Sequence, residues 1–177
     1  MLSAYSLAAP FALQMLSMTA DEFYFHRRRG LPRWERVGHP IDTLSVLVCY
    51  GWLLLVAPDG RAVAVYAALA TLSCLLVTKD EHVHRRLCDS AEQWLHAVLF
   101  LLHPLVLLAA ALLWPALHGP GSGSAWIRYT GWEKAFVAGA AAATALFGAY
   151  QVIYWNLLCP PPATGRTAVS TTISTSS

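Results

Sequence analysis

Charged side chains are scarce in this sequence, since Asp, Glu, Lys and Arg make up only 12% of its 177 residues. A water-soluble domain of this length needs more charge on its surface, so the scarcity argues against a soluble globular protein. The four cysteines show no paired spacing, which gives no indication of a disulfide framework or a zinc ribbon. The net charge is only +2 and the basic residues lie beside apolar blocks, so we expect membrane lipids as partners and no nucleic acid.

Apolar residues make up 56% of the chain and fall into long blocks that are almost free of charge. Each block is near the roughly 20 residues that an α-helix needs to cross about 30 Å of hydrocarbon. The predicted fold class is therefore all-α, a polytopic membrane protein whose residues 1–159 form one helical bundle. About five transmembrane helices are predicted, at 2–20, 41–58, 62–78, 94–117 and 135–158. No Lys or Arg precedes the first block, so we interpret it as a span and not as a signal peptide.

The basic residues predict the orientation, because Lys and Arg beside membrane spans are retained on the cytoplasmic side. With five spans, one face holds segments 21–40 and 79–93 and the C-terminal tail, which together carry nine of the twelve Lys and Arg residues. We therefore expect a multi-pass protein of the cell membrane with its N-terminus outside and its C-terminus in the cytoplasm. The tail over 160–177 is rich in Pro, Thr and Ser, which predicts disorder.

Acidic and histidine side chains gather at this same predicted cytoplasmic face. Six of the seven histidines and eight of the ten acids belong to it, while His118 lies at the opposite end. The positive-inside rule explains arginine there, but it makes no prediction for Glu or His. Another cause is needed for their position.

The two cytoplasmic segments contain an internal repeat. The first copy reads DEFYFHRRRGLPRWERVGH over 21–39, and the second reads DEHVHRRLCDSAEQWLH over 80–96. Both contain Asp-Glu, then His-Arg-Arg, then a Glu followed four residues later by His. The repeat predicts that spans one and two, and spans three and four, are duplicated hairpins related by an axis along the membrane normal. Such an axis would bring the two motifs together.

The repeated Glu and His pairs predict a metal centre, because residues three or four apart share one face of a helix. Mixed carboxylate and imidazole shells in helical bundles hold two iron or manganese ions, often with Glu-x-x-His spacing. We expect two divalent metal ions, with iron favoured and zinc or manganese as alternatives. The predicted ligands are Glu22, His26, Glu35, His39, Glu81, His84, Glu92 and His96. The predicted second-shell or pocket residues are Asp42, His82, His103, Asp21 and Asp80.

Simpler interpretations compete for single residues of this set. Glu92 could cap its helix, with Asp89 or Ser90 just ahead of it, and a Glu near an Arg could form a surface ion pair. The repetition favours metal binding, because neither a cap nor an ion pair requires a repeated histidine. Pro40 disfavours helical geometry at the preceding residue, which makes His39 the weakest predicted ligand. A heme would leave the repeated carboxylates unexplained.

Two further features bear on the surroundings of the site. His103 lies seven residues past His96, about 10 Å deeper in the membrane, where it suits either a substrate cavity or a hydrogen bond to a carbonyl. The aromatic residues near the end of the last span, among them Tyr150 and Trp155, are typical of helix packing or of a belt at the membrane interface.

The leading functional hypothesis is a non-heme di-iron oxidoreductase that oxidises, desaturates or hydroxylates a lipid-soluble substrate, with electrons from a separate donor. Polytopic membrane desaturases and hydroxylases are similar in architecture, but their repeated HxxHH boxes are absent here. A zinc-dependent membrane lipid hydrolase is the nearest enzymatic alternative, because zinc also binds His and carboxylate ligands. A metal carrier, a metal sensor or a structural membrane protein are the non-enzymatic alternatives.

Overall fold

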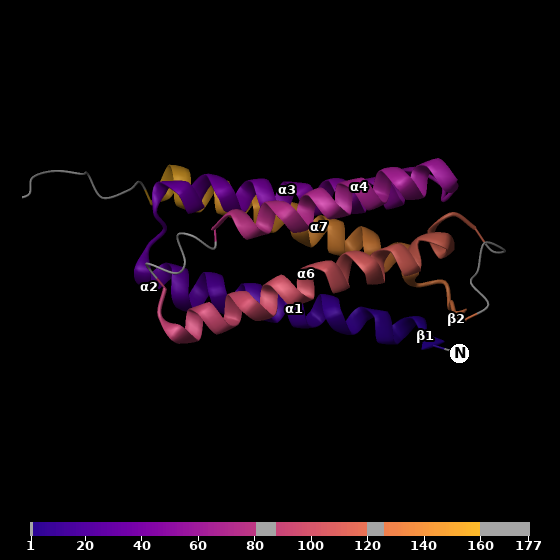
Figure 1. The fold of residues 1–177 in the computed structure, drawn as a ribbon, viewed down its shortest axis with the longest axis horizontal. Helices are drawn as coiled ribbons and strands as arrows, with labels where there is room; N and C mark the ends of the chain where they lie inside the picture. The colour runs from indigo at the N-terminus through magenta and orange to yellow at the C-terminus, as the bar shows by residue number, and fades with distance from the viewer. Residues whose placement is uncertain (1, 81–87, 120–125, 160–177) are drawn as a thin grey trace, which may run out of the picture.

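The computed structural model describes residues 2–80, 88–119 and 126–159, and these residues are almost entirely helical (Figure 1). The elements in chain order are β1 (Leu2–Ser3), η1 (Ala4–Ala8), α1 (Ala9–Ala20), η2 (Asp21–His26), α2 (Arg27–Arg29), α3 (Arg33–Leu55), α4 (Gly60–Leu76), η3 (Val77–Asp80), α6 (Ser90–Leu117), β2 (Ile127–Arg128), α7 (Glu133–Val152) and η4 (Ile153–Leu158). The segments η1 and η3 are 3-10 helices, whereas η2 and η4 are π-helices that continue α1 and α7. The two short strands pair in parallel.

Four helices are long and apolar enough to cross a membrane, at Arg33–Leu55, Gly60–Lys79, Ser90–Leu117 and Glu133–Leu158. They correspond to the second to fifth predicted spans, and each begins earlier than predicted. The largest difference is in α3, which starts at Arg33 instead of position 41 and passes through Pro40. The first predicted span, 2–20, divides into β1, η1 and the 12-residue α1, so it is not one of these four. The count of five spans stays a prediction.

The helices lie in two layers that follow the long axis of the molecule (Figure 1). One layer holds α1 and α6, and the other holds α3 with α4 and α7. This packing differs from the predicted hairpins, because α1 packs along α6 and not along α3. Gly148 allows α7 to approach α3 closely, since a Cβ atom at this position would lie only 3.1 Å from Cγ2 of Thr43.

Large apolar side chains are exposed around the outside of both layers, including Leu16, Leu55, Leu101, Leu146 and Leu157. In water, so much exposed apolar surface would be unfavourable, whereas in a bilayer it would face lipid tails. The arrangement is therefore compatible with a membrane protein.

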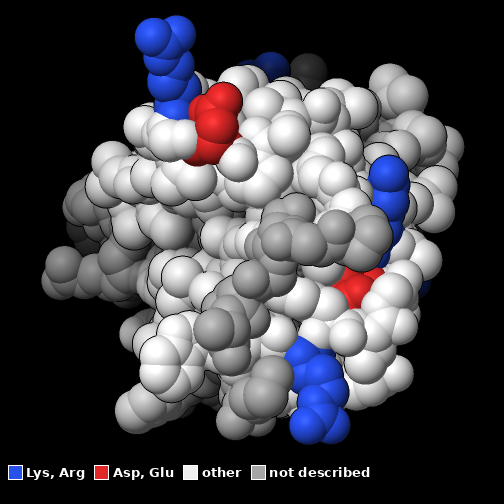
Figure 2. All heavy atoms as spheres, turned by 90° about the vertical axis from the view of Figure 1, so that its right-hand side faces the viewer, with Lys and Arg blue, Asp and Glu red and all other residues white. Residues whose placement is uncertain are grey.

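The two ends of the bundle differ in charge. Figure 1 places β1, β2 and the turn between α3 and α4 at one end, and α2 and the start of α6 at the other. Few charged side chains are visible on the end that carries β1 and β2 (Figure 2). The segments that lie together at each end of the bundle are the same ones that the distribution of Lys and Arg predicts to share one side of the membrane. Which face is cytoplasmic stays a prediction.

Reporter fusions test this orientation. We expect reporters at Gly30 and Cys88 to be cytoplasmic and reporters at Gly60 and Gly131 to lie outside, because the positive-inside rule acts on the end that is rich in arginine. The measurement is the paired activity of a cytoplasm-dependent and an export-dependent reporter at each position. Opposite locations for Gly30 and Cys88 would contradict the shared site, whereas inversion of all four would contradict only the orientation.

Candidate metal centre

The first part of the centre is built by η2, the π-helix that runs from Asp21 to His26. A π-helix has hydrogen bonds from residue i to i+5, so residues five apart share a face, whereas in an α-helix they would be about 140° apart. Oδ2 of Asp21 consequently lies 3.3 Å from Nε2 of His26, and both side chains are buried. Single π-helical turns are frequent at functional sites.

Four buried side chains converge here, each offering one ligand atom, and these atoms lie within 4.8 Å of one another: Asp21, His26, Glu92 and His96. Nε2 of His96 is 3.1 Å from Oδ1 of Asp21, and Nε2 of His26 is 3.9 Å from Oε1 of Glu92. The contact between Asp21 and His96 joins the end of α1 to the start of α6. Both copies of the repeat therefore contribute to one cluster.

The carboxylate of Glu92 is available to this cluster because another residue caps the helix. Asp89 is the N-cap of α6, and its Oδ1 accepts a hydrogen bond of 2.9 Å from the backbone N–H of Glu92. The capping interpretation thus applies to Asp89 and leaves the side chain of Glu92 to face the cluster.

A second group shares His26 with the first and adds Glu35 and His39 from α3, again with ligand atoms within 4.8 Å of one another. Glu35 is fully buried, and the ring centroids of His26 and His39 are 4.9 Å apart. Glu35 and His39 are one helical turn apart, so they present their side chains on the same face of α3.

The expectation that Pro40 would disturb the helix at His39 is wrong, because α3 continues through both residues. Proline lacks the N–H that would bond the carbonyl of Arg36, four residues earlier. The side-chain amide of Asn156 donates a hydrogen bond of 3.3 Å to that carbonyl. The compensating donor thus comes from η4, 120 positions later in the chain.

Glu22 orients His26 instead of joining either group. Its Oε2 lies 3.4 Å from Nδ1 of His26. Its Oε1 accepts hydrogen bonds of 2.8 Å from the hydroxyl of Tyr150 and 2.7 Å from the indole N–H of Trp155. Trp155 is buried, which fits helix packing, one of the two roles expected for it, and not an exposed position in an interfacial belt. The contact with Tyr150, a residue for which packing was the favoured role, likewise ties α7 to the site.

Arg29 is a part of the centre that the sequence analysis missed. Its Nη2 lies 3.0 Å from Oε1 of Glu92 and 2.9 Å from Oε2 of Glu35. One guanidinium therefore bridges both ligand groups. The only signal in the sequence is that the first copy of the repeat has a third Arg where the second copy has Leu87.

The surroundings favour charged forms of Asp21 and His26. Burial alone would raise the pKa of the Asp21 carboxyl, but the hydrogen bond with His96 and the charge of His26 lower that pKa overall. Burial alone would lower the pKa of His26, but the hydrogen bond with Glu22 and the charge of Asp21 raise that pKa overall. The site consequently stabilises positive charge at the position of the His26 ring.

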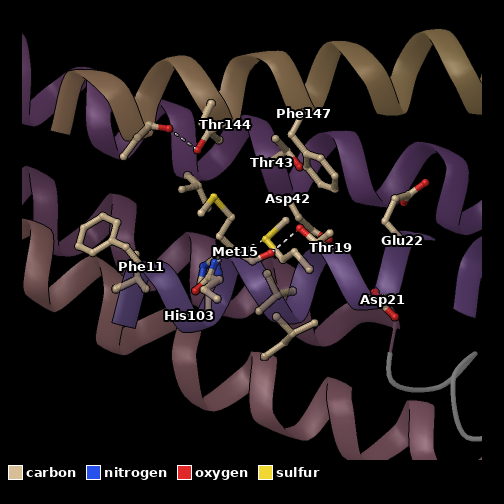
Figure 3. Close-up of a pocket in the computed structure, with 18 of the residues that line it drawn as sticks. Phe11, Met15, Thr19, Asp21, Glu22, Asp42, Thr43, His103, Thr144 and Phe147 are labelled. Carbon is tan, nitrogen blue, oxygen red and sulfur yellow. Dashed lines mark hydrogen bonds between the residues drawn. The ribbon is translucent and has the colours of Figure 1, made fainter. Parts of the chain in front are cut away.

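A cavity of about 690 Å³ opens beside the cluster, between the two helical layers. Its polar end is lined by Asp21, Glu22, His26, His39, Asp42 and His96. Its remaining wall is mostly apolar, with Phe11, Met15, Val46, Phe136 and Phe147 among the lining residues. Figure 3 shows Asp21 and Glu22 at one end of the cavity and Phe11 at the other. The cavity is amphipathic along its length.

Several predicted residues lie outside the two groups. Asp42 forms an ion pair with Lys79 at 2.6 Å, and His103 lines the cavity with its Nε2 2.9 Å from the hydroxyl of Ser73. Glu81, His82 and His84 lie outside the described residues, as does the side chain of Asp80. Their predicted roles stay predictions.

Comparison with known proteins gives no relative from which a function could be transferred. No protein-family model matches the chain, and neither the curated proteins nor the solved structures contain a match. The chain is thus a mostly helical protein with apolar helices long enough to span a membrane and a buried acid and histidine cluster that could hold a metal ion.

Proposed function

We propose that this chain is an integral membrane metalloprotein, a non-heme di-iron oxidoreductase whose substrate is lipid-soluble. Asp21, His26, Glu92 and His96 would hold one metal ion. Glu35 and His39 would contribute to a second, for which Glu81 and His84 are the further predicted ligands. Bound iron would supply the activation of oxygen for oxidation, desaturation or hydroxylation. The residues of the chain would hold the metal, orient its ligands and keep water from the substrate.

The arrangement around His26 is the observation that carries this proposal. Metal-binding histidines usually donate one ring N–H to a carboxylate and coordinate through the other nitrogen. Nδ1 of His26 faces Glu22, which is itself held by Tyr150 and Trp155. Nε2 has no hydrogen-bond partner among the described residues and points toward the carboxylates of Asp21 and Glu92. Asp21 thus takes the ligand position, and Glu22 the supporting one.

The charge of the cluster also supports a bound cation. The cluster contains four buried carboxyl groups, those of Asp21, Glu22, Glu35 and Glu92. Two of them, Glu35 and Glu92, contact the guanidinium of Arg29. Arg29 and a protonated His26 would supply two positive charges against these four carboxylates, so two negative charges would stay uncompensated within the described part of the cluster. Burying an uncompensated charge costs roughly several kcal/mol of folding free energy per ion, even after the protein relaxes around it. Divalent cations would offset it.

The cavity supports a lipid-soluble substrate. Its volume of about 690 Å³ lies within the range of small-molecule sites, roughly 300–1,000 Å³. The apolar wall suits a hydrocarbon chain, and the polar end would place one part of that chain beside His26 and His96.

A structural polar network is the second candidate, and the position of Arg29 favours it. Its guanidinium already pairs with Glu35 and Glu92, so part of the buried negative charge is compensated without a metal. A network of this kind predicts a stable protein that contains no metal. Zinc hydrolysis stays an alternative that differs only in the metal and the reaction.

Metal analysis of detergent-purified, full-length protein tests the proposal. We expect about two iron atoms per chain, because carboxylate and imidazole ligands in helical bundles hold iron pairs. The measurements are elemental analysis together with optical and EPR spectra of oxidised and partly reduced protein. Stoichiometric zinc would overturn the oxidoreductase in favour of the hydrolase. Well-folded protein that takes up no metal on reconstitution would overturn both enzymes.

A further inference from the structure

The middle of the cavity contains polar residues that are mostly satisfied by the protein itself. The hydroxyl of Thr19 donates to the carbonyl of Met15, and the hydroxyl of Thr144 donates to the carbonyl of Ala140 (Figure 3). Thr43 donates to Oε1 of Gln151 at 2.7 Å. These groups have no need of a ligand.

Gln14 and His103 are different. Oε1 of Gln14 is buried without a hydrogen-bond partner among the described residues, and its Nε2 has only Sδ of Met18, at 3.9 Å. Buried amide oxygens are rarely left unpaired. Both Gln14 and His103 line the cavity, and His103 is buried, with a relative exposure of 5%.

The hydrogen bonds around His103 determine which ring nitrogen is protonated. Ser45 uses its single hydroxyl proton on the carbonyl of Asp42, so the contact of 2.7 Å between Ser45 and Ser73 requires Ser73 as the donor. Ser73 must then accept at its own oxygen, 2.9 Å from Nε2 of His103. In the neutral ring, Nε2 carries the proton and Nδ1 is an acceptor, for which the described residues provide no donor.

Gln14 and His103 also lie at the same depth. Helices α1 and α6 are antiparallel, and Asp21 of the first segment contacts His96 of the second (Figure 1). Gln14 is seven residues before Asp21, and His103 is seven residues after His96, so each is about 10 Å from the cluster. An amide and an imidazole acceptor thus flank one level of an otherwise apolar cavity.

The cavity is long enough for an extended chain to pass this level. On α1 and its flanking segments, lining residues run from Ala8 to Glu22, which is about 21 Å at 1.5 Å per residue. We propose that the cavity binds one elongated lipid lengthwise and that Gln14 and His103 hydrogen-bond a hydroxyl group partway along its chain. The hydroxyl has a single proton, which it donates either to Nδ1 of His103, with its oxygen accepting from Nε2 of Gln14, or to Oε1 of Gln14. This substrate class rests on the proposed function, but its binding requires no metal.

Equilibrium binding of radiolabelled esters to detergent-solubilised, full-length protein tests this proposal. The probes are methyl stearate and its 6-, 9- and 12-hydroxy derivatives, measured with metal-depleted and metal-loaded protein. We expect one hydroxy ester to bind about tenfold more tightly than methyl stearate, because its hydroxyl donates a hydrogen bond to a buried acceptor that otherwise lacks a donor. The position of the preferred hydroxyl along the chain shows how far the ester group of the bound lipid lies from Gln14 and His103.

Two variants of similar shape remove the polar groups, Gln14→Leu and His103→Phe. We expect methyl stearate to bind both variants still. In each variant, the affinity ratio of the preferred hydroxy ester to methyl stearate should fall close to the ratio of their partitioning into detergent micelles without protein. Thr144→Val is the matched control, since its hydroxyl is already bonded within α7, and it should keep the wild-type ratio. Equal affinity for all four esters in wild-type protein overturns the proposal, as does a preference that survives both variants. Preference in a protein that takes up no metal upholds this proposal and overturns only the enzyme.

Discussion

Replacing His26 by alanine is expected to remove most of the bound metal, lowering the metal content at least about tenfold. Loss of a residue that only supports a ligand already costs about 10–100-fold in metal affinity, and His26 is a proposed direct ligand. His26 is common to both ligand groups, and it stands between the carboxylates of Asp21 and Glu92. Its loss opens a coordination position in the centre of the cluster and leaves Glu22 without the ring that it orients. Elemental analysis of purified variant and wild-type protein measures the effect.

Arg28→Ala is the matched control for this variant. Arg28 lies two residues away, but its guanidinium is stacked over the ring of Tyr24, 3.8 Å from the centroid, and it is exposed. We expect its loss to leave the metal content unchanged. The repeat also predicts that His84→Ala will resemble His26→Ala. Wild-type metal content in the His26 variant, with normal folding, would contradict the metal centre.

Helical periodicity was sufficient to predict much of the candidate site. The pairs Glu35–His39 and Glu92–His96 are one turn apart in regular α-helix, and the structure brings both to the cluster. The apolar blocks likewise indicated four of the helices, because their length and lack of charge are properties of the sequence alone.

The roles of Asp21 and Glu22 could not be predicted in this way. Spacing of four favours Glu22 as the partner of His26 in an α-helix, but the π-helical register of η2 places Asp21 beside the same ring. Whether a helix widens at one turn depends on tertiary packing, to which local sequence gives little access. The contacts of Tyr150 and Trp155 with Glu22 were beyond reach for a related reason, since they join residues 128 and 133 positions apart.

Substitution of Arg29 is the variant that best distinguishes a metal centre from a structural network. Its guanidinium pairs with two buried carboxylates, those of Glu35 and Glu92. Removing one partner of a buried ion pair typically costs about 3–5 kcal/mol, and the lower end applies because the Arg29 side chain is 19% exposed. In a network, nothing else would replace that charge, whereas in a metal centre the cation would.

We therefore expect Arg29→Met to lower the melting temperature of metal-depleted protein by roughly 10 °C, about 3 kcal/mol for a chain of this size. Saturating metal should recover most of that loss, because a ligand that binds only the folded state stabilises it by mass action. Thermal unfolding of detergent-solubilised protein, measured with and without metal, provides the comparison. Arg28→Met is the control, and its melting temperature should stay near that of wild type in both conditions. If metal raises the melting temperature of neither wild-type protein nor the Arg29 variant, the cluster is a structural network and the protein is better described as a non-enzymatic membrane component.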